Sequence, residues 1–351
     1  MPVSYDALLV VSFGGPEAPA DVLPFLENVT RGRGVPAERL REAAEHYRHF
    51  GGVSPINAQN RALVAAVRED FGRHGLDLPV FWGNRNWRPY LTDAVREMAQ
   101  HGVRRALAFV TSAYASYPAC RQYQEDIAGG RAAVGPAAPA VDKLRHYFNH
   151  SGFIEPNADA VRAALATLHP RVRTDVRLVF TAHSIPVLTA ARSGPAGGLY
   201  VRQLREAAAL VAAAGAPELP WDLVWQSRSG APTTAWLEPD VNDYLREAAA
   251  GGATAVVVSP IGFVSDHVEV CWDLDHEAAG TAARMGLAFA RAGTAGADPR
   301  FVTMIRHLVI ERLAPPGRRA ALGTLGASHD VCPANCCLGP DAPPSGQTTR
   351  G

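Results

Sequence analysis

The stretch SPIGFVSDHVEVCWDLDHE, Ser259–Glu277, joins the end of an apolar strand to an acid-rich segment through Pro and Gly. A helix over the acid-rich part would place Glu269, Asp273 and Glu277 at positions i, i+4 and i+8, so three carboxylates would line one face. Like charges at that spacing repel one another, and such a row usually persists because it binds cations or moves protons. The preceding strand supplies a rigid base, because α/β folds place ligands at the carboxyl ends of their strands.

A second apolar strand, RLVFTAHSIP, ends in the same manner at His183. An imidazole beside a row of carboxylates can accept protons near neutral pH and can ligate a divalent ion. Taken alone, His183 fits a hydrogen-bonded structural histidine better, since the chain contains 12 histidines. Asp266 or His267 could cap the start of the acidic helix, and we favour Asp266, because Asp accepts backbone N–H bonds.

Strands and helices alternate along the whole chain. Apolar runs at 7–12, 106–111, 177–182 and 255–261 are bounded by Gly, Pro or polar turns, and Ala- and Arg-rich helical stretches separate them. This alternation is typical of parallel sheets. ALLVVSFGGP resembles RLVFTAHSIP, and GVRRALAFVTSAYASY resembles GATAVVVSPIGFVSDH. The sequence therefore predicts an α/β protein of two similar Rossmann-like halves, with a ligand cleft between them.

The boundary between the halves is predicted near 150–175, where NHSGFIEPNADAV begins a helix with Pro156 near its start. The first half then covers 1–155 and includes a binding lip, and the second covers 156–314 and includes the histidine and the acidic helix. Residues 315–351 form a Cys-containing tail.

Composition narrows the class of protein. The chain has 351 residues, of which 47% are hydrophobic, and its formal net charge of zero gives no support to a nucleic-acid partner. No stretch approaches the roughly 20 apolar residues of a membrane span, and MPVSYD lacks the pattern of a signal peptide. We expect a soluble, cytoplasmic monomer.

Six motifs in order resemble those of the ferrochelatase family, which inserts ferrous iron into a porphyrin at the last or penultimate step of haem synthesis. The similarity covers residues 5 to 312, nearly the whole globular part. The motifs are LLVVSFGGP at 8–16, RHFGGVSPIN at 48–57, TAHSIP at 181–186, WQSRSG at 225–230, WLEPDV at 236–241 and GFVSDHVEVCWDLD at 262–275.

The resemblance implies a metal-inserting lyase with His183 and Glu269 as catalytic residues that meet the substrate iron. The reaction requires that two pyrrole protons are removed and that Fe²⁺ loses its water, and the sequence leaves open which residue does which. Asp273 and Glu277 would then form a path for protons or iron. The alternative for these two carboxylates is a solvated helix face.

Substrate choice depends on the segment between Asn28 and Asn57. Ferrochelatases that act on protoporphyrin at a membrane have an apolar lip here, whereas this chain is polar, which favours coproporphyrin III with its four propionates. A protoporphyrin IX enzyme and a non-catalytic porphyrin or iron carrier remain alternatives. The resemblance implies that the porphyrin contacts Phe13, Arg31, Arg33, His46, Tyr47, Arg48, Ser54 and Tyr123.

Two of these expectations have a physical basis in the residue type. Arg can pair each propionate through two N–H bonds. Phe13 stands where several soluble relatives have a Tyr whose oxygen ligates iron, and Phe offers no donor atom, so water or no ligand would occupy that axial position.

Handover of the poorly soluble product to a later enzyme of haem synthesis is a further expectation.

The tail contains Cys332, Cys336 and Cys337 in a C-x-x-x-C-C pattern. Some ferrochelatases carry a [2Fe–2S] cluster bound by cysteines of a C-terminal extension and one earlier cysteine, so the resemblance implies a structural or sensory cluster here. A cluster needs four ligands, and Cys120 or Cys271 must supply the fourth. We favour Cys120, since Cys271 is expected to pack beside the acidic helix as a small hydrophobe. A zinc site is the alternative.

Overall fold

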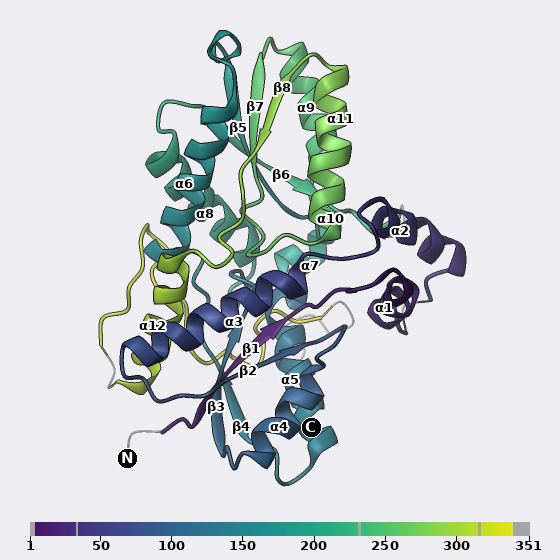
Figure 1. Ribbon diagram of the computed structural model, residues 1–351. Helices are drawn as coiled ribbons and strands as arrows, with labels where there is room; N and C mark the ends of the chain where they lie inside the picture. The colour runs from purple at the N-terminus through teal and green to yellow at the C-terminus, as the bar shows by residue number, and fades with distance from the viewer. Residues whose placement is uncertain (1–3, 33, 231–232, 315–316, 340–351) are drawn as a thin grey trace, which may run out of the picture.

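The computed structural model describes residues 4–32, 34–230, 233–314 and 317–339. Two parallel four-stranded sheets, one in each half of the chain, form its centre (Figure 1). The first has the order β2 (Val80–Asn84), β1 (Ala7–Ser12), β3 (Arg105–Val110) and β4 (Ala140–Lys143). The second has the order β6 (Trp221–Gln226), β5 (Val176–His183), β7 (Ala255–Ser259) and β8 (Ala288–Arg291).

The two sheets confirm the predicted fold class and the echo between the halves. β1 and β5 occupy the same place in the two sheets, as do β3 and β7, and these are the strands whose sequences resemble each other. The four predicted strands are the four inner strands, and the four that the sequence did not reveal lie at the sheet edges. Both faces of the inner strands are buried, so successive side chains are apolar and the strands form continuous apolar runs.

Helices cover the sheets. In the first half these are α3 (Ile56–Arg73), α4 (Leu91–Gln100), the π-helix η2 (Tyr117–Arg121) and α5 (Gln122–Val134). In the second half they are α6 (Ser151–Thr167), the 3₁₀ turn η3 (Pro170–Val172), α7 (Val187–Ala191), α8 (Leu199–Gly215), α9 (Val241–Ala250), α11 (Ala279–Arg284) and α12 (Pro299–Leu313). α12 packs against both α6 and α3, so it joins the halves.

The start of α6 differs from the sequence prediction. The helix begins at Ser151, and the His150 side chain caps it by accepting the N–H of Gly152 at 3.0 Å. Pro156 therefore lies inside the helix instead of near its first turn. A proline there removes one intrahelical hydrogen bond, a cost that the buried packing of α6 against α8 and α12 outweighs.

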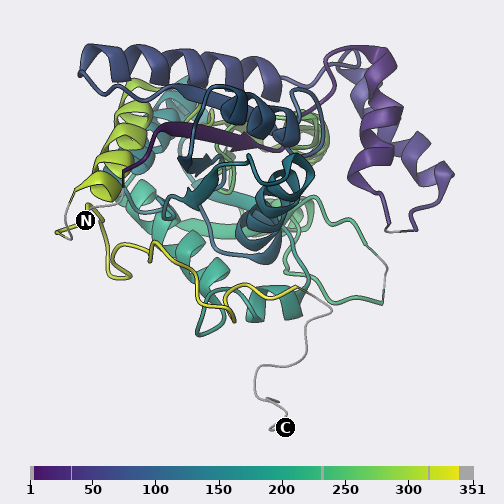
Figure 2. The ribbon, with the colours of Figure 1, turned by 90° about the horizontal axis from the view of Figure 1, so that it is seen from below.

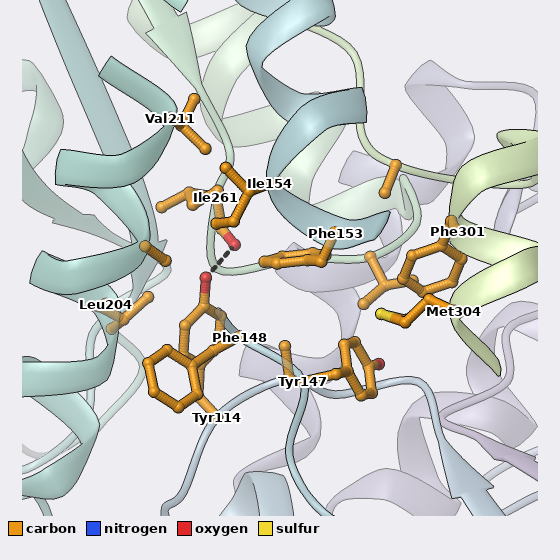
Figure 3. Packing of buried hydrophobic residues seen from close by; sticks show 14 of the residues in the cluster. Tyr114, Tyr147, Phe148, Phe153, Ile154, Leu204, Val211, Ile261, Phe301 and Met304 are labelled. Atoms are coloured by element: carbon orange, nitrogen blue, oxygen red, sulfur yellow. Dashed lines mark hydrogen bonds between the residues drawn. The ribbon is translucent and has the colours of Figure 1, made fainter. Parts of the chain in front are cut away.

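Both halves contribute to one hydrophobic core. Phe153 and Phe301, from α6 and α12, pack against Tyr147, and all three side chains are fully buried (Figure 3). Tyr114, in the loop after β3, donates a hydrogen bond of 2.8 Å to the backbone carbonyl of Ile261, in the loop after β7. The ends of β3 and β7 are thereby held at a fixed separation.

A two-helix lip stands apart from the sheets. After the short 3₁₀ turn η1 (Pro19–Asp21), it comprises α1 (Val22–Val29) and α2 (Ala37–His49) (Figures 1 and 2). The lip has a small core of its own, in which Phe25 of α1 packs beside Ala44 of α2. The tail, residues 317–339, runs across the side of the molecule away from α3 (Figure 2). No helix in the described part of the chain is both long and apolar enough to cross a membrane.

Candidate active site

A cleft of about 730 Å³ lies where the strand ends of both halves meet. Its lining includes Phe13 after β1, Arg85 after β2, Thr111 after β3, His183 at the end of β5 and Gly262 after β7. This is the position at which α/β sheets bind ligands, because parallel strands direct their carboxyl ends to one edge.

Most of the predicted site residues reach this cleft. Arg48 does not line it and instead forms an exposed ion pair with Glu45. Arg33 lies outside the described residues. The predicted residues that line the cleft are Phe13, Arg31, His46, Tyr47, Ser54, Tyr123, His183 and Glu269.

His183 and Glu269 face each other across the cleft floor. Nε2 of His183 lies 3.7 Å from Oε2 of Glu269, and the two side chains are 34% and 42% exposed. Nδ1 of His183 donates a hydrogen bond to the carbonyl of Ser184, which leaves Nε2 of the neutral ring with a free lone pair. Burial lowers the pKa of His183 and so favours that neutral form. Tyr200 donates a 2.9 Å hydrogen bond to the carbonyl of His183 and holds the strand end in place.

The next carboxylate, Asp273, lies behind Glu269. Burial raises the pKa of each to about 7, and the negative charge of Glu269 contributes to the shift at Asp273. Asp273 accepts hydrogen bonds from Ser227 and, at 3.2 Å, from Gln226. These neutral donors balance only part of the cost of burying two like charges, so the pair holds a proton near neutral pH.

The acidic segment is not the regular α-helix that the sequence suggested. One helical turn, α10 (Val268–Val270), passes into the π-helix η4 (Cys271–Ala278). A π-helix has a wider turn than an α-helix and occurs mostly at functional sites. Glu277, at its far end, is exposed and accepts a hydrogen bond of 2.9 Å from Nε1 of Trp272.

The predicted cap of this helix was wrong. His267 caps it, because its Nδ1 accepts the N–H of Val270 at 3.4 Å. Asp266 instead pairs with Arg291 at 3.0 Å, and its own N–H donates to Oε1 of Gln59. Because Arg291 is largely buried between acidic groups, it holds the Asp266 carboxylate away from the helix end.

An aromatic stack connects the lip to the π-helix, and sequence reasoning missed it. The ring of His46, on α2, lies parallel to Trp272 with a centroid distance of 3.9 Å, and His276 stacks on the same indole at 4.2 Å. His49 meets both Trp272 and His276 edge-on. The lip is thus attached to the element that carries Glu269.

Arg85 is a second site residue that the sequence did not reveal. Its guanidinium lies 4.7 Å from the ring centroid of Tyr123, its Nε lies 2.9 Å from Asp126, and its side chain is only 8% exposed. Burial raises the pKa of Asp126, and the charge of Arg85 opposes that shift. Arg85 follows β2, an edge strand without a continuous apolar run, so no strand end indicated its position.

The structure brings the tail cysteines against Cys120. The thiol of Cys120 contacts the thiols of Cys332 and Cys337. The thiol of Cys336 contacts the same two thiols, and its Sγ lies 3.7 Å from Sγ of Cys337. The backbone φ of Cys337 is +54°, unusual for a residue with a Cβ, and lets two consecutive side chains meet. A hydrogen bond with Cys120 lowers the pKa of the Cys332 thiol. A second hydrogen bond with Cys120 lowers the pKa of the Cys337 thiol to about 4. Lowered thiol pKa values favour the thiolate form that binds metals.

Cys271 lies elsewhere, at the start of η4. Burial and, to a smaller extent, the nearby carboxylates of Asp266 and Asp275 together raise the pKa of its thiol to about 11. The thiol is therefore protonated near neutral pH, and it is the one cysteine of the chain outside the set formed by Cys120 and the tail.

Comparisons with known proteins agree with this geometry. Residues 5–313 match the ferrochelatase family. The chain is 57% identical to the coproporphyrin III ferrochelatase of Streptomyces coelicolor, with 95% of this chain and 93% of that protein covered. It is 57% identical to the coproporphyrin III ferrochelatase of Mycolicibacterium smegmatis, with 90% and 93% covered, and 53% identical to a ferrochelatase of Rhodopirellula baltica, with 95% and 93% covered.

Among solved structures, the fold is similar to that of SirB from Bacillus subtilis with Fe³⁺. The TM-score is 0.53 and the sequence identity 11%, with 89% of this chain and 96% of that chain covered. At this identity the similarity concerns the fold alone. The family match spans nearly the whole described chain and includes both residues that face each other in the cleft. The chain therefore belongs to the ferrochelatase family.

Proposed function

We propose that the protein inserts ferrous iron into coproporphyrin III, as a lyase of haem synthesis. The observation that carries the proposal is the pairing of His183 with Glu269 at 3.7 Å on the floor of a cleft that both halves enclose. Two proton acceptors at one point suit a reaction that must remove two pyrrole protons before iron can bind the ring nitrogens. A non-catalytic carrier needs affinity but no base.

His183 and Glu269 are suited to the reaction in different ways. The hydrogen bond from Nδ1 of His183 to Ser184 directs the Nε2 lone pair at the cleft, where it can accept a proton or contact the iron. Glu269, with a pKa of about 7, is partly ionised at neutral pH and can accept the second proton. Asp273, behind it, can receive that proton in turn, and Glu277 at the exposed end of η4 can release it to solvent.

The lining of the cleft suits a porphyrin with several carboxylates. Arg31 and His46 belong to the lip, and Tyr47, Ser54 and Tyr123 add hydroxyl groups to the same cleft. Propionates accept hydrogen bonds from such groups, and Arg can bind a carboxylate with two of its N–H groups. Relatives that are 56–57% identical to the chain bear the name coproporphyrin III ferrochelatase, and this supports the same choice of substrate.

The function is tested by anaerobic insertion of Fe²⁺, followed by absorbance, with coproporphyrin III and protoporphyrin IX offered separately. We expect a strong preference for coproporphyrin III, because the lip provides polar groups for propionates in place of an apolar surface. Equal or reversed preference would contradict the assignment of the lip. Porphyrin binding without insertion of any metal would favour the carrier.

Glu269→Gln tests the role of the carboxylate. The change keeps the shape of the side chain and removes its ability to accept a proton, so the insertion rate should fall by about a hundredfold or more. Porphyrin affinity, measured by fluorescence titration, should stay near that of the unaltered protein. Glu97→Gln, on the exposed face of α4, is the matched control and should change neither quantity. Retained turnover in Glu269→Gln would remove this residue from the mechanism.

The pH dependence of insertion tests the interaction between Glu269 and Asp273. Activity should fall as the pH drops through about 7, because protonated carboxyls cannot accept protons. Asp273→Asn removes one like charge, so ionisation of Glu269 becomes easier and the acidic limb of kcat/KM should move to lower pH. Asp275→Asn, on the same π-helix but paired with Arg291, should leave the limb in place. If the acidic limb stays at the same pH in Asp273→Asn, repulsion between Asp273 and Glu269 does not set the position of the limb.

We also propose that Cys120, Cys332, Cys336 and Cys337 hold a [2Fe–2S] cluster. The donor set fits, because the four sulfurs form a ring in which each contacts two others, and the pKa values of Cys332 and Cys337 are lowered while those of Cys120 and Cys336 are raised. Such a cluster carries electrons, and here it would also fasten the tail to the η2 segment, whose Pro118 and Ala119 line the cleft. Zinc is the alternative occupant of a four-sulfur site.

The cluster proposal is tested by changing two cysteines in parallel. Cys120→Ala should abolish the visible absorption of the cluster and lower the iron and sulfide content of protein purified without oxygen. Cys271→Ala should leave both unchanged, since its thiol lies beside Asp275 and away from the sulfur set. Loss of the cluster in Cys271→Ala with retention in Cys120→Ala would reverse the assignment, and zinc in place of iron would identify the other occupant.

The last part of the proposal concerns the compartment, the oligomeric state and the transfer of the product. We infer that the protein acts in the cytoplasm as a monomer and passes its iron porphyrin to a later enzyme of haem synthesis. The low solubility of free iron porphyrin supports a direct transfer.

A further inference from the structure

A fifth metal-binding side chain reaches the cysteine set. Nε2 of His329 lies 3.9 Å from Sγ of Cys336, and the imidazole also hydrogen-bonds the thiol of Cys332. The ligand atoms of these three residues lie within 4.8 Å of one another. Five donor side chains therefore converge on a site where a [2Fe–2S] cluster takes four ligands.

The arrangement of the contacts separates His329 from the other four donors. The sulfurs form a closed ring in which Cys120 touches Cys332 and Cys337, and Cys336 touches the same two. His329 is not a member of this ring, and it contacts two neighbouring sulfurs of the ring, those of Cys332 and Cys336.

The opposite edge of the ring has a donor of its own. The backbone N–H of Gly194, in the loop between α7 and α8, donates to Sγ of Cys337 at 3.2 Å. This N–H group can hydrogen-bond a sulfur but cannot ligate a metal. It therefore shows that an N–H group can donate to a sulfur of this ring without being a ligand.

We propose that His329 is not a ligand of the centre but an outer donor, whose Nε2–H hydrogen-bonds the thiolates of Cys332 and Cys336 and raises the reduction potential of the bound cluster. The inference rests on the proposed four-cysteine cluster and adds the residue that regulates its electron affinity. Hydrogen bonds to cluster sulfurs stabilise negative charge there, and the one-electron reduced cluster carries more of it.

The surroundings of the site favour the same effect. Lys143 exerts its charge on Cys120 and Cys332. His146 is buried beside Cys332 and His329. The nearby positive charge of Lys143 acts through space, whereas His329 acts through a directed hydrogen bond. Substitution of His329 therefore tests the hydrogen bond and leaves the general field unchanged.

The test compares His329→Ala with His329→Gln in the full chain, each loaded with iron and sulfide without oxygen. The midpoint potential is measured by redox titration of the visible and electron paramagnetic resonance signals, with iron and sulfide determined on the same samples. We expect His329→Ala to keep its full iron and sulfide but to have a more negative potential. His329→Gln retains an N–H donor and should recover part of the shift. His101→Ala, an exposed histidine after α4, should match the unaltered protein.

Three results would overturn the proposal. An unchanged potential in His329→Ala at full iron content would show that the hydrogen bond has no effect. Loss of iron, with an altered signal in the remainder, would make His329 a ligand and displace one cysteine from the set. If the unaltered protein takes up iron without sulfide, or zinc alone, the cluster itself is wrong and the inference fails with it. The iron and sulfide content of the unaltered protein separates this last case from the first two.

Discussion

The cleft depends on the hydrogen bond between Tyr114 and the carbonyl of Ile261. The bond joins the loop after β3 to the loop after β7 within a core that both halves share, and both groups are fully buried. A buried donor or acceptor that lost its partner would cost about 1–3 kcal/mol, so the two loops are not free to separate. Ile261 begins the loop that leads from β7 to α10, the turn that carries Glu269, so this contact constrains the start of that loop.

The chemistry of the site comes from charges that burial leaves incompletely balanced. Glu269 and Asp273 are close together, and the donors to Asp273 are the uncharged side chains of Ser227 and Gln226. Arg291 offers a contrast, because it pairs with Asp266 and Asp275 on the other side of the same segment. Along one short stretch, Glu269 in the cleft and Asp273 behind it keep raised pKa values, while Asp266 and Asp275 pair with Arg291. This division allows one helix to be both rigid and able to exchange protons.

The tail has an unusual place in this arrangement. It leaves the second half after α12 and returns to the first half at Cys120, beside residues that line the cleft. Its course is held by ordinary polar contacts as well, since Glu206 accepts the N–H groups of Thr324 and Leu325, and Arg121 donates to the carbonyl of Ala334. A redox centre in the tail would thus be in direct contact with the scaffold of the cleft.

The sequence by itself determined the fold class and the four inner strands, and its resemblance to the ferrochelatase family indicated His183 and Glu269, the two residues that meet at 3.7 Å. Inner strands are buried on both sides and so appear as apolar runs, and the residues at their ends are conspicuous because they interrupt those runs. Only the tertiary structure decided the rest. Arg85 follows an edge strand with a weaker apolar pattern. Trp272 of the π-helix stacks on His46 of the lip, and the ring of sulfurs includes a left-handed backbone at Cys337. These features arise from contacts between segments far apart in the chain, and local periodicity contains no information about which distant side chains will meet.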